Sequence, residues 1–161
     1  MKRIVLLLLI AIFTIPFHSD AKGKADSPMA YEIIGSGTGT QGTYLVEISY
    51  HTKDKKISDQ ALKRAAVHGV LFRGFSNPEA RQSQKPLAGG PANEAQHIDF
   101  YKEFFSEKGT AADYANLVPG SRSVKKVNKE YVVTATVTVN KETLAKYLQQ
   151  MGVIRGLNSA F

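Results

Sequence analysis

Two runs of alternating apolar and polar side chains constrain the fold of this chain more than any other feature. In residues 130–139, valine or alanine stands at every odd position from 133 on, with threonine between them. Residues 43–51 alternate in a similar way. A period of two puts one set of side chains on the core side of a strand and the other set on the opposite side. The chain is therefore predicted to form an antiparallel sheet that is covered on a single face.

Two hairpins and three helices follow one another in the order β-β-α-α-β-β-α. The predicted elements cover, in chain order, residues 31–36, 43–51, 58–73, 94–108, 122–127, 130–139 and 141–151. This order predicts an α+β domain in which an antiparallel sheet of about four strands has its helices packed on one face.

The first predicted helix carries a stripe of small residues. Ser58 is a good N-cap because its hydroxyl can accept a bond from a first-turn N–H. Ala65, Ala66 and Gly69 then recur at helical spacing. Glycine destabilises a helix interior by up to about 1 kcal/mol relative to alanine. We therefore expect Gly69 to pack closely against the sheet.

The start of the chain has the three-part layout of a secretory signal peptide. A positively charged start precedes an apolar run at residues 4–17, and Ser19 and Ala21 occupy the small-residue positions of a cleavage site. The alternative is an uncleaved membrane anchor, but this run is shorter than the roughly 20 residues that span a bilayer core. We expect residues 1–21 to be removed, which leaves a periplasmic or secreted protein that begins near Lys22 and has no stable membrane span.

Residues 22–29 are predicted to be a flexible leader, and residues 30–161 a single domain. Within that domain, residues 76–93 are rich in proline, contain a Gly-Gly pair and lack an apolar period. Loops of this length in a compact domain are usually functional or disordered, so we expect a working surface here. The sequence contains no cysteine, which excludes disulfides, thiolate metal sites, thiol catalysis and lipid attachment at a cysteine.

No motif predicts a cofactor or a metal. Gly37-x-Gly39-x-x-Gly42 matches the dinucleotide fingerprint as a string, but an alternating strand follows it in place of the helix that receives the pyrophosphate. We interpret these glycines as a turn. Glu94-x-x-His97 puts a carboxylate and an imidazole one helical turn apart, whereas a metal site in a helix bundle needs two such pairs and further glutamates. A solvated helix face is the better interpretation of this pair.

Histidines are the residues on which an enzymatic function would depend. Histidine exchanges protons near neutral pH, so a small hydrolase that uses His68 or His97 with an acid such as Asp99 is the alternative to a binding function. The sequence contains no G-x-S-x-G nucleophile elbow and no identifiable set of nucleophile, base and orienting group. No catalytic residue is therefore predicted, and an inhibitor or effector is a third interpretation.

Basic residues form the predicted binding surface. The formal net charge of +7 permits contact with acidic polymers or an anionic membrane surface. The predicted binding residues are Arg81, Lys85, Arg122, Lys125, Lys126 and Lys129. We expect an envelope protein or an acidic polymer as the partner, and no nucleic acid, because no aromatic side chains are interleaved with these cations. The alternative is that lysines on an edge strand prevent sheets from aggregating.

The first predicted helix has the pattern A-x-x-x-A-A-V-x-G-V-x-F-x-G at residues 61–74. Together with the preceding hairpin, over about residues 31–75, it resembles small exported bacterial proteins of unknown function. It is also similar to the LPP20-like envelope lipoprotein and flagellar-assembly T N-terminal domains, which pair a sheet with an alanine-rich helix. The lipoprotein cysteine is absent here. The resemblance implies an envelope-associated, non-enzymatic role, and with the export signal it predicts a binding or assembly module of the cell envelope.

Overall fold

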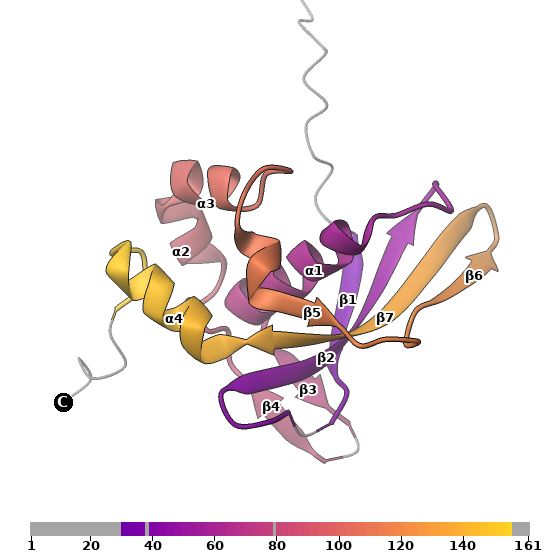
Figure 1. Cartoon of the computed structure of the whole chain (residues 1–161), viewed down its shortest axis with the longest axis horizontal. Coiled ribbons are helices and arrows are strands. Elements are labelled where there is room, and N and C mark those ends of the chain that lie inside the picture. The colour runs from indigo at the N-terminus through magenta and orange to yellow at the C-terminus, as the bar shows by residue number, and fades with distance from the viewer. Residues whose placement is uncertain (1–29, 38, 79, 156–161) are drawn as a thin grey trace, which may run out of the picture.

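The computed structural model describes residues 30–37, 39–78 and 80–155. The predicted signal peptide and leader lie outside the described residues. In the part that is described, no helix combines the length and the apolar character that a bilayer crossing requires. Figure 1 shows short helices beside a twisted main sheet, with a separate two-stranded hairpin below it.

Among the described residues, five antiparallel strands form the main sheet, in the order β1-β2-β7-β5, with β6 also paired to β7. They are β1 (Tyr31–Gly35), β2 (Thr43–Thr52), β5 (Ala115–Leu117), β6 (Ser123–Val127) and β7 (Glu130–Asn140). This sheet and its helices confirm the predicted α+β class. The fifth strand, β5, has no counterpart in the prediction, because its three residues are too few to show a period of two.

The strand register places the alternating apolar residues of β2 and β7 on the same face. Val46 pairs with Val137, and Ile48 pairs with Ala135; all four side chains are fully buried. The threonines of β7 lie on the opposite face and are only half-buried. α1 (Asp59–His68) packs against β2, β5 and β7. One face of the sheet therefore carries the core, as predicted.

α1 begins where the sequence predicts it and is followed by a close approach to the sheet. The Ser58 hydroxyl accepts a hydrogen bond from the Ala61 N–H at 3.2 Å. After α1 the chain continues as a π-helical turn, Gly69–Arg73. A Cβ atom on Gly69 would lie only 2.6 Å from Cδ1 of Ile33 on β1. The predicted close packing at Gly69 is confirmed.

Residues 76–93, predicted as one long loop, contain regular structure. β3 (Phe75–Asn77) and β4 (Gln82–Gln84) form a small hairpin beside β1, and α2 (Pro91–Gln96) begins near the end of the segment. Pro91 takes the first helical position, where a backbone N–H has no partner within the helix. Pro91, which in the sequence contributes to the prediction of a loop, therefore begins a helix.

The single helix predicted for residues 94–108 is wrong, because the chain breaks at His97. This residue has φ −117° and ψ 37°, outside the helical region, and it separates α2 from α3 (Ile98–Phe104). The break allows α3 to bury Tyr101 and Phe104 while Glu94 of α2 faces α1.

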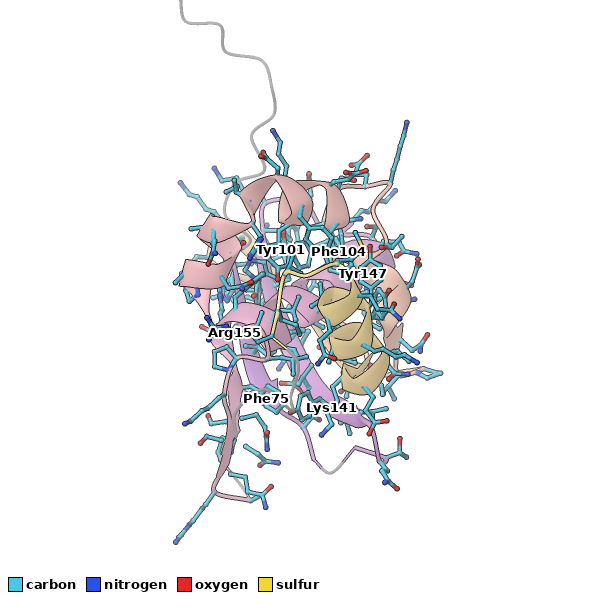
Figure 2. All side chains as sticks on the ribbon, turned by 90° about the vertical axis from the view of Figure 1, so that its left-hand side faces the viewer. Phe75, Tyr101, Phe104, Lys141, Tyr147 and Arg155 are labelled. Carbon is cyan, nitrogen blue, oxygen red and sulfur yellow. The ribbon has the colours of Figure 1, made fainter. Side chains whose placement is uncertain are left out.

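α3 is connected to the sheet and to the last helix. A 3-10 turn, η2 (Ala111–Tyr114), leads from α3 into β5, and α4 (Lys141–Gln150) follows β7 directly. The Phe104 and Tyr147 rings of α3 and α4 stack with centroids 5.9 Å apart and 23° between their planes. Figure 2 shows these two rings next to Tyr101. α3 is thus packed against both the core and α4.

Candidate functional site

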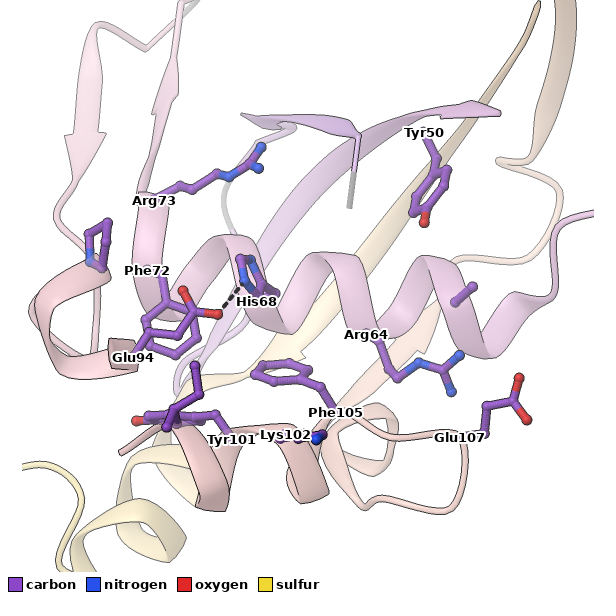
Figure 3. A pocket seen from close by; sticks show the side chains of 13 residues that line it. Tyr50, Arg64, His68, Phe72, Arg73, Glu94, Tyr101, Lys102, Phe105 and Glu107 are labelled. Atoms are coloured by element: carbon purple, nitrogen blue, oxygen red, sulfur yellow. Dashed lines mark hydrogen bonds and ion pairs between the residues drawn. The ribbon is translucent and has the colours of Figure 1, made fainter. Parts of the chain in front are cut away.

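A cavity of about 600 Å³ opens between α1 and the α2–α3 pair (Figure 3). Its lining residues come from β2, from α1 and its π-helical turn, from both helices α2 and α3, and from the turn after α3. We call this cavity the α1–α3 pocket. Segments that lie far apart in the sequence therefore build a single concave surface.

His68, the last residue of α1, connects three elements at the inner end of the pocket. Its Nδ1 atom lies 2.6 Å from the Tyr31 hydroxyl of β1, and its Nε2 atom lies 3.0 Å from Oε1 of Glu94 on α2. A neutral ring satisfies both contacts when the Tyr31 hydroxyl donates to Nδ1 and the Nε2–H donates to the carboxylate. The His68 side chain therefore holds β1, α1 and α2 together.

Burial determines the protonation of this group. It lowers the pKa of His68 below its ordinary value, and the nearby Glu94 carboxylate opposes that shift only in part. It also raises the pKa of the Tyr31 hydroxyl, with the Arg73 guanidinium acting in the opposite direction. At neutral pH the Tyr31 phenol and the His68 imidazole are therefore both neutral.

Arg73 fixes Tyr31 from the other side. The Arg73 guanidinium lies 4.0 Å from the centre of the Tyr31 ring and donates to the Tyr31 carbonyl oxygen at 2.7 Å. A guanidinium over an aromatic face is attracted by the negative charge density of the ring. The hydroxyl that donates to His68 is therefore held in place through both the ring and the backbone of Tyr31.

Aromatic rings form the floor of the pocket. The His68 ring meets Phe72 and Phe105 with centroid distances of 5.0 and 5.4 Å, and Phe72 meets Tyr101 edge to face at 4.8 Å. The Tyr101 hydroxyl donates to Oδ1 of Asn93 at 2.9 Å. The side-chain amide of Asn93 in turn donates to the backbone carbonyl of residue 153 at 2.7 Å. The polar atoms of Tyr101 and Asn93 are thus bonded to protein partners rather than directed into the pocket.

The rim of the pocket is charged and partly apolar. Arg64 of α1 and Lys102 of α3 line it together with Glu107 from the turn after α3, and Figure 3 shows the Arg64 side chain directed toward Glu107. Ile98 also lines the pocket and is 59% exposed. A ligand that enters the pocket would meet charges at the rim and rings below them.

The two histidines that are candidates for an enzymatic function, His68 and His97, lie in different surroundings. His68 lies in the α1–α3 pocket, whereas His97 and Asp99 are not among its lining residues. Glu94 does contact a histidine, but its partner is His68 on another helix rather than His97 one turn away. The local spacing in the sequence therefore indicates the wrong partner.

The six predicted binding residues do not form one surface. Arg81 and Lys85 flank β4 in the β3–β4 hairpin beside β1, while Lys125, Lys126 and Lys129 belong to the β6–β7 hairpin at the other edge of the sheet. The sixth residue, Arg122, contacts Oδ1 of Asp59 at 2.5 Å and the carbonyl oxygen of residue 57 at 2.7 Å. Arg122 therefore links the start of α1 to the start of β6.

The sequence does not predict most residues of the pocket as functional. Phe72, Tyr101 and Phe105 line the pocket, but they lie within segments predicted as helices and none of them is a candidate site residue. The one available signal is the cluster of rings in residues 100–105, which is larger than the stripe needed to bury a single short helix.

Neither a metal site nor a known family explains the pocket. In residues 30–37, 39–78 and 80–155, no group of three or more histidine, aspartate or glutamate side chains could hold a metal ion. Comparison of the chain with models of protein families, with curated proteins and with solved structures finds no match. The function must therefore be argued from the site.

Proposed function

We propose that this protein is an exported binding module of the bacterial cell envelope and that its ligand occupies the α1–α3 pocket. The observation that carries the proposal is a cavity of about 600 Å³ with an aromatic floor and a charged rim. Ligand pockets commonly enclose about 300–1,000 Å³ and combine apolar walls with a few placed polar groups. The predicted signal peptide supports export.

The shape of the pocket is set before any ligand binds. His68 bonds to Tyr31 and Glu94, so one half-buried side chain connects α1 and α2, which both line the cavity, to each other and to β1. A ligand then has little protein structure to order, which lowers the free-energy cost of binding. This preorganisation is the property expected of a binding site.

The same contacts argue against the hydrolase alternative at His68. Both ring nitrogens already have a protein partner, and a general base needs a nitrogen within hydrogen-bond reach of the proton it removes. Tyr31 is 4% exposed, and the raised pKa of its hydroxyl makes it a poor nucleophile. These observations favour binding over hydrolysis.

A nuclear magnetic resonance titration tests the proposal with three probes that share a ring and differ in charge: 3-phenylpropionate, 3-phenylpropanamide and 3-phenylpropylamine. We expect at least one probe to shift the backbone amide signals of Phe72, Tyr101 and Phe105. Ala61→Trp should abolish the shifts, because Ala61 lines the pocket. Gln60→Trp is the matched control, since the neighbouring Gln60 is exposed and does not line the pocket.

Two results would contradict the proposal. One is that none of the three probes shifts signals at the pocket. The other is that the shifts survive Ala61→Trp as well as they survive Gln60→Trp.

A further inference from the structure

A second surface lies at the end of the sheet where β2 stops and β6 turns into β7. Tyr131 of β7 pairs with Thr52 on one side and with Lys126 on the other. The loop that follows Thr52 and the β6–β7 turn therefore lie at the same end of the sheet, at the right of Figure 1. This register brings together two lysine-rich segments that are about seventy positions apart in the sequence.

Six lysines gather there, and we call this surface the lysine tip. Its lysines are Lys53, Lys55, Lys56, Lys125, Lys126 and Lys129, and all six are exposed. Within the same two segments, residues 53–56 and 125–130, the acidic residues are Asp54 and Glu130. No ion pair in the described part of the chain involves any of the six lysines. With six lysines and two acidic residues, the two segments carry a formal net charge of +4, so the tip is cationic.

Apolar side chains are exposed among these charges. Val124 and Val127 of β6 are 39% and 50% exposed. A hollow of about 530 Å³ lies beside the turn and is lined by Val127, Lys129 and His51, among others. An exposed valine next to lysines does not strengthen the binding of a fully hydrophilic polymer. Burying it where the headgroups of a lipid layer meet the acyl chains does contribute binding free energy.

The type of cation points in the same direction. The cations of the tip are all lysines. The arginine nearest to them in the sequence, Arg122, is bonded to Asp59. Lysine is a point charge on a flexible stem, whereas arginine recognises a single phosphate or carboxylate with a fixed fork of donors. Several lysines without arginine suit a diffuse layer of negative charge better than one defined anion.

We propose that the lysine tip binds the surface of an anionic membrane, with the lysines against lipid phosphates and Val127, which lies next to the turn, at the headgroup level. This contact is independent of the α1–α3 pocket and requires no span of the bilayer. A soluble acidic polymer is the other partner that a lysine cluster can bind, and the experiment below distinguishes the two.

Vesicle flotation tests this proposal, using vesicles of phosphatidylcholine alone and vesicles that also contain phosphatidylglycerol. All variants carry the complete sequence and are compared at identical N-termini, established by intact mass, so residues 1–29 contribute equally to each. Binding should require phosphatidylglycerol. It should also weaken as salt rises from about 0.1 M to about 1 M, because the screening length falls from about 10 Å to about 3 Å.

Two independent triple variants locate the contact. Lys125→Gln/Lys126→Gln/Lys129→Gln alters the hairpin, and Lys53→Gln/Lys55→Gln/Lys56→Gln alters the loop. Each should weaken binding by about 100-fold, because one lysine near an anionic surface contributes about fivefold. Lys85→Gln/Lys108→Gln/Lys146→Gln removes the same charge from positions outside the tip and should weaken binding by less than about fivefold.

Three results would overturn the proposal. One is an equal loss in the tip variants and the control. Another is equal binding to vesicles with and without phosphatidylglycerol. The third is that soluble poly-glutamate binds with the same dependence on the tip while the vesicles do not bind.

Discussion

The contact between Gly69 and Ile33 predicts that Gly69→Ala and Ile33→Val are strongly coupled. A Cβ at Gly69 would lie 2.6 Å from Cδ1 of Ile33 and 3.2 Å from the Tyr31 ring. Ile33→Val removes the Cδ1 atom and leaves the rest of the side chain, so it relieves the closest of these contacts. The backbone at Gly69 has φ −62° and ψ −45°, so alanine meets no backbone strain there.

The expected free energies follow from these distances. In the presence of Ile33, Gly69→Ala gains about 1 kcal/mol of helix propensity and loses about 1–3 kcal/mol through overpacking, so the net effect ranges from neutral to about 2 kcal/mol of destabilisation. Ile33→Val alone should destabilise by about 0.5–1.5 kcal/mol, toward the lower end because Ile33 is half-buried. In the Ile33→Val background, Gly69→Ala should be neutral or stabilising. Because the helix-propensity gain is the same in both backgrounds, the coupling energy equals the overpacking that Ile33→Val relieves, which is about 1–3 kcal/mol if the relief is complete.

Urea unfolding of the wild type, both single variants and the double variant measures this coupling. Ile34→Val is the matched control, because Ile34 is the next residue of β1, lies on the opposite face of the sheet and is 41% exposed. Its effect should add to that of Gly69→Ala. If Gly69→Ala destabilised the protein equally with and without the Ile33→Val substitution, the close approach of the π-helical turn to β1 would be refuted.

Two further predictions concern the pocket. The folded-state pKa of His68 lies below its unfolded value of about 6.5. Between these two pKa values the unfolded chain binds more protons than the folded protein, so the free energy of unfolding should decrease as the pH is lowered through this range. The slope should be at most about 1.4 kcal/mol per pH unit. Urea unfolding at several pH values should show a shallower fall in His68→Gln, and equal slopes in both proteins would assign the effect to another group. Tyr101→Phe removes the donor to Asn93 and should destabilise by about 1 kcal/mol. It should also speed amide hydrogen exchange near residue 153, and unchanged exchange there would refute a supporting role for this bond.

Local signals in the sequence are sufficient for the strands and the helix starts. The alternation in β2 and β7 indicates which residues face the core, and the Ser58 cap indicates where α1 begins. Both signals act within a few residues, so a single sequence contains them completely. The break at His97 and the three-residue strand β5 depend on contacts with distant elements, and no local pattern contains that information.

The sequence predicts the site poorly for the same reason. His68 and Glu94 both stand out in the sequence, but the spacing of one helical turn associates Glu94 with His97. The actual contact joins residues 26 positions apart, and the Tyr31 contact joins residues 37 positions apart. Such pairs become visible only when the packing of β1, α1 and α2 is known, since any of several carboxylates could have met the histidine.

The α1–α3 pocket and the lysine tip are linked through β2. Tyr50 lines the pocket, and Thr52, two residues further along the same strand, lies at the tip beside Tyr131. Two residues of a strand span about 7 Å, so a chain whose tip rests on a lipid surface would hold the edge of its pocket close to the headgroups. The two sites nevertheless use different side chains. Ala61→Trp should therefore leave vesicle binding intact, and the hairpin lysine variant should leave the probe-induced shifts at Phe72 intact, whereas a loss of both in either variant would show that the two sites depend on one another.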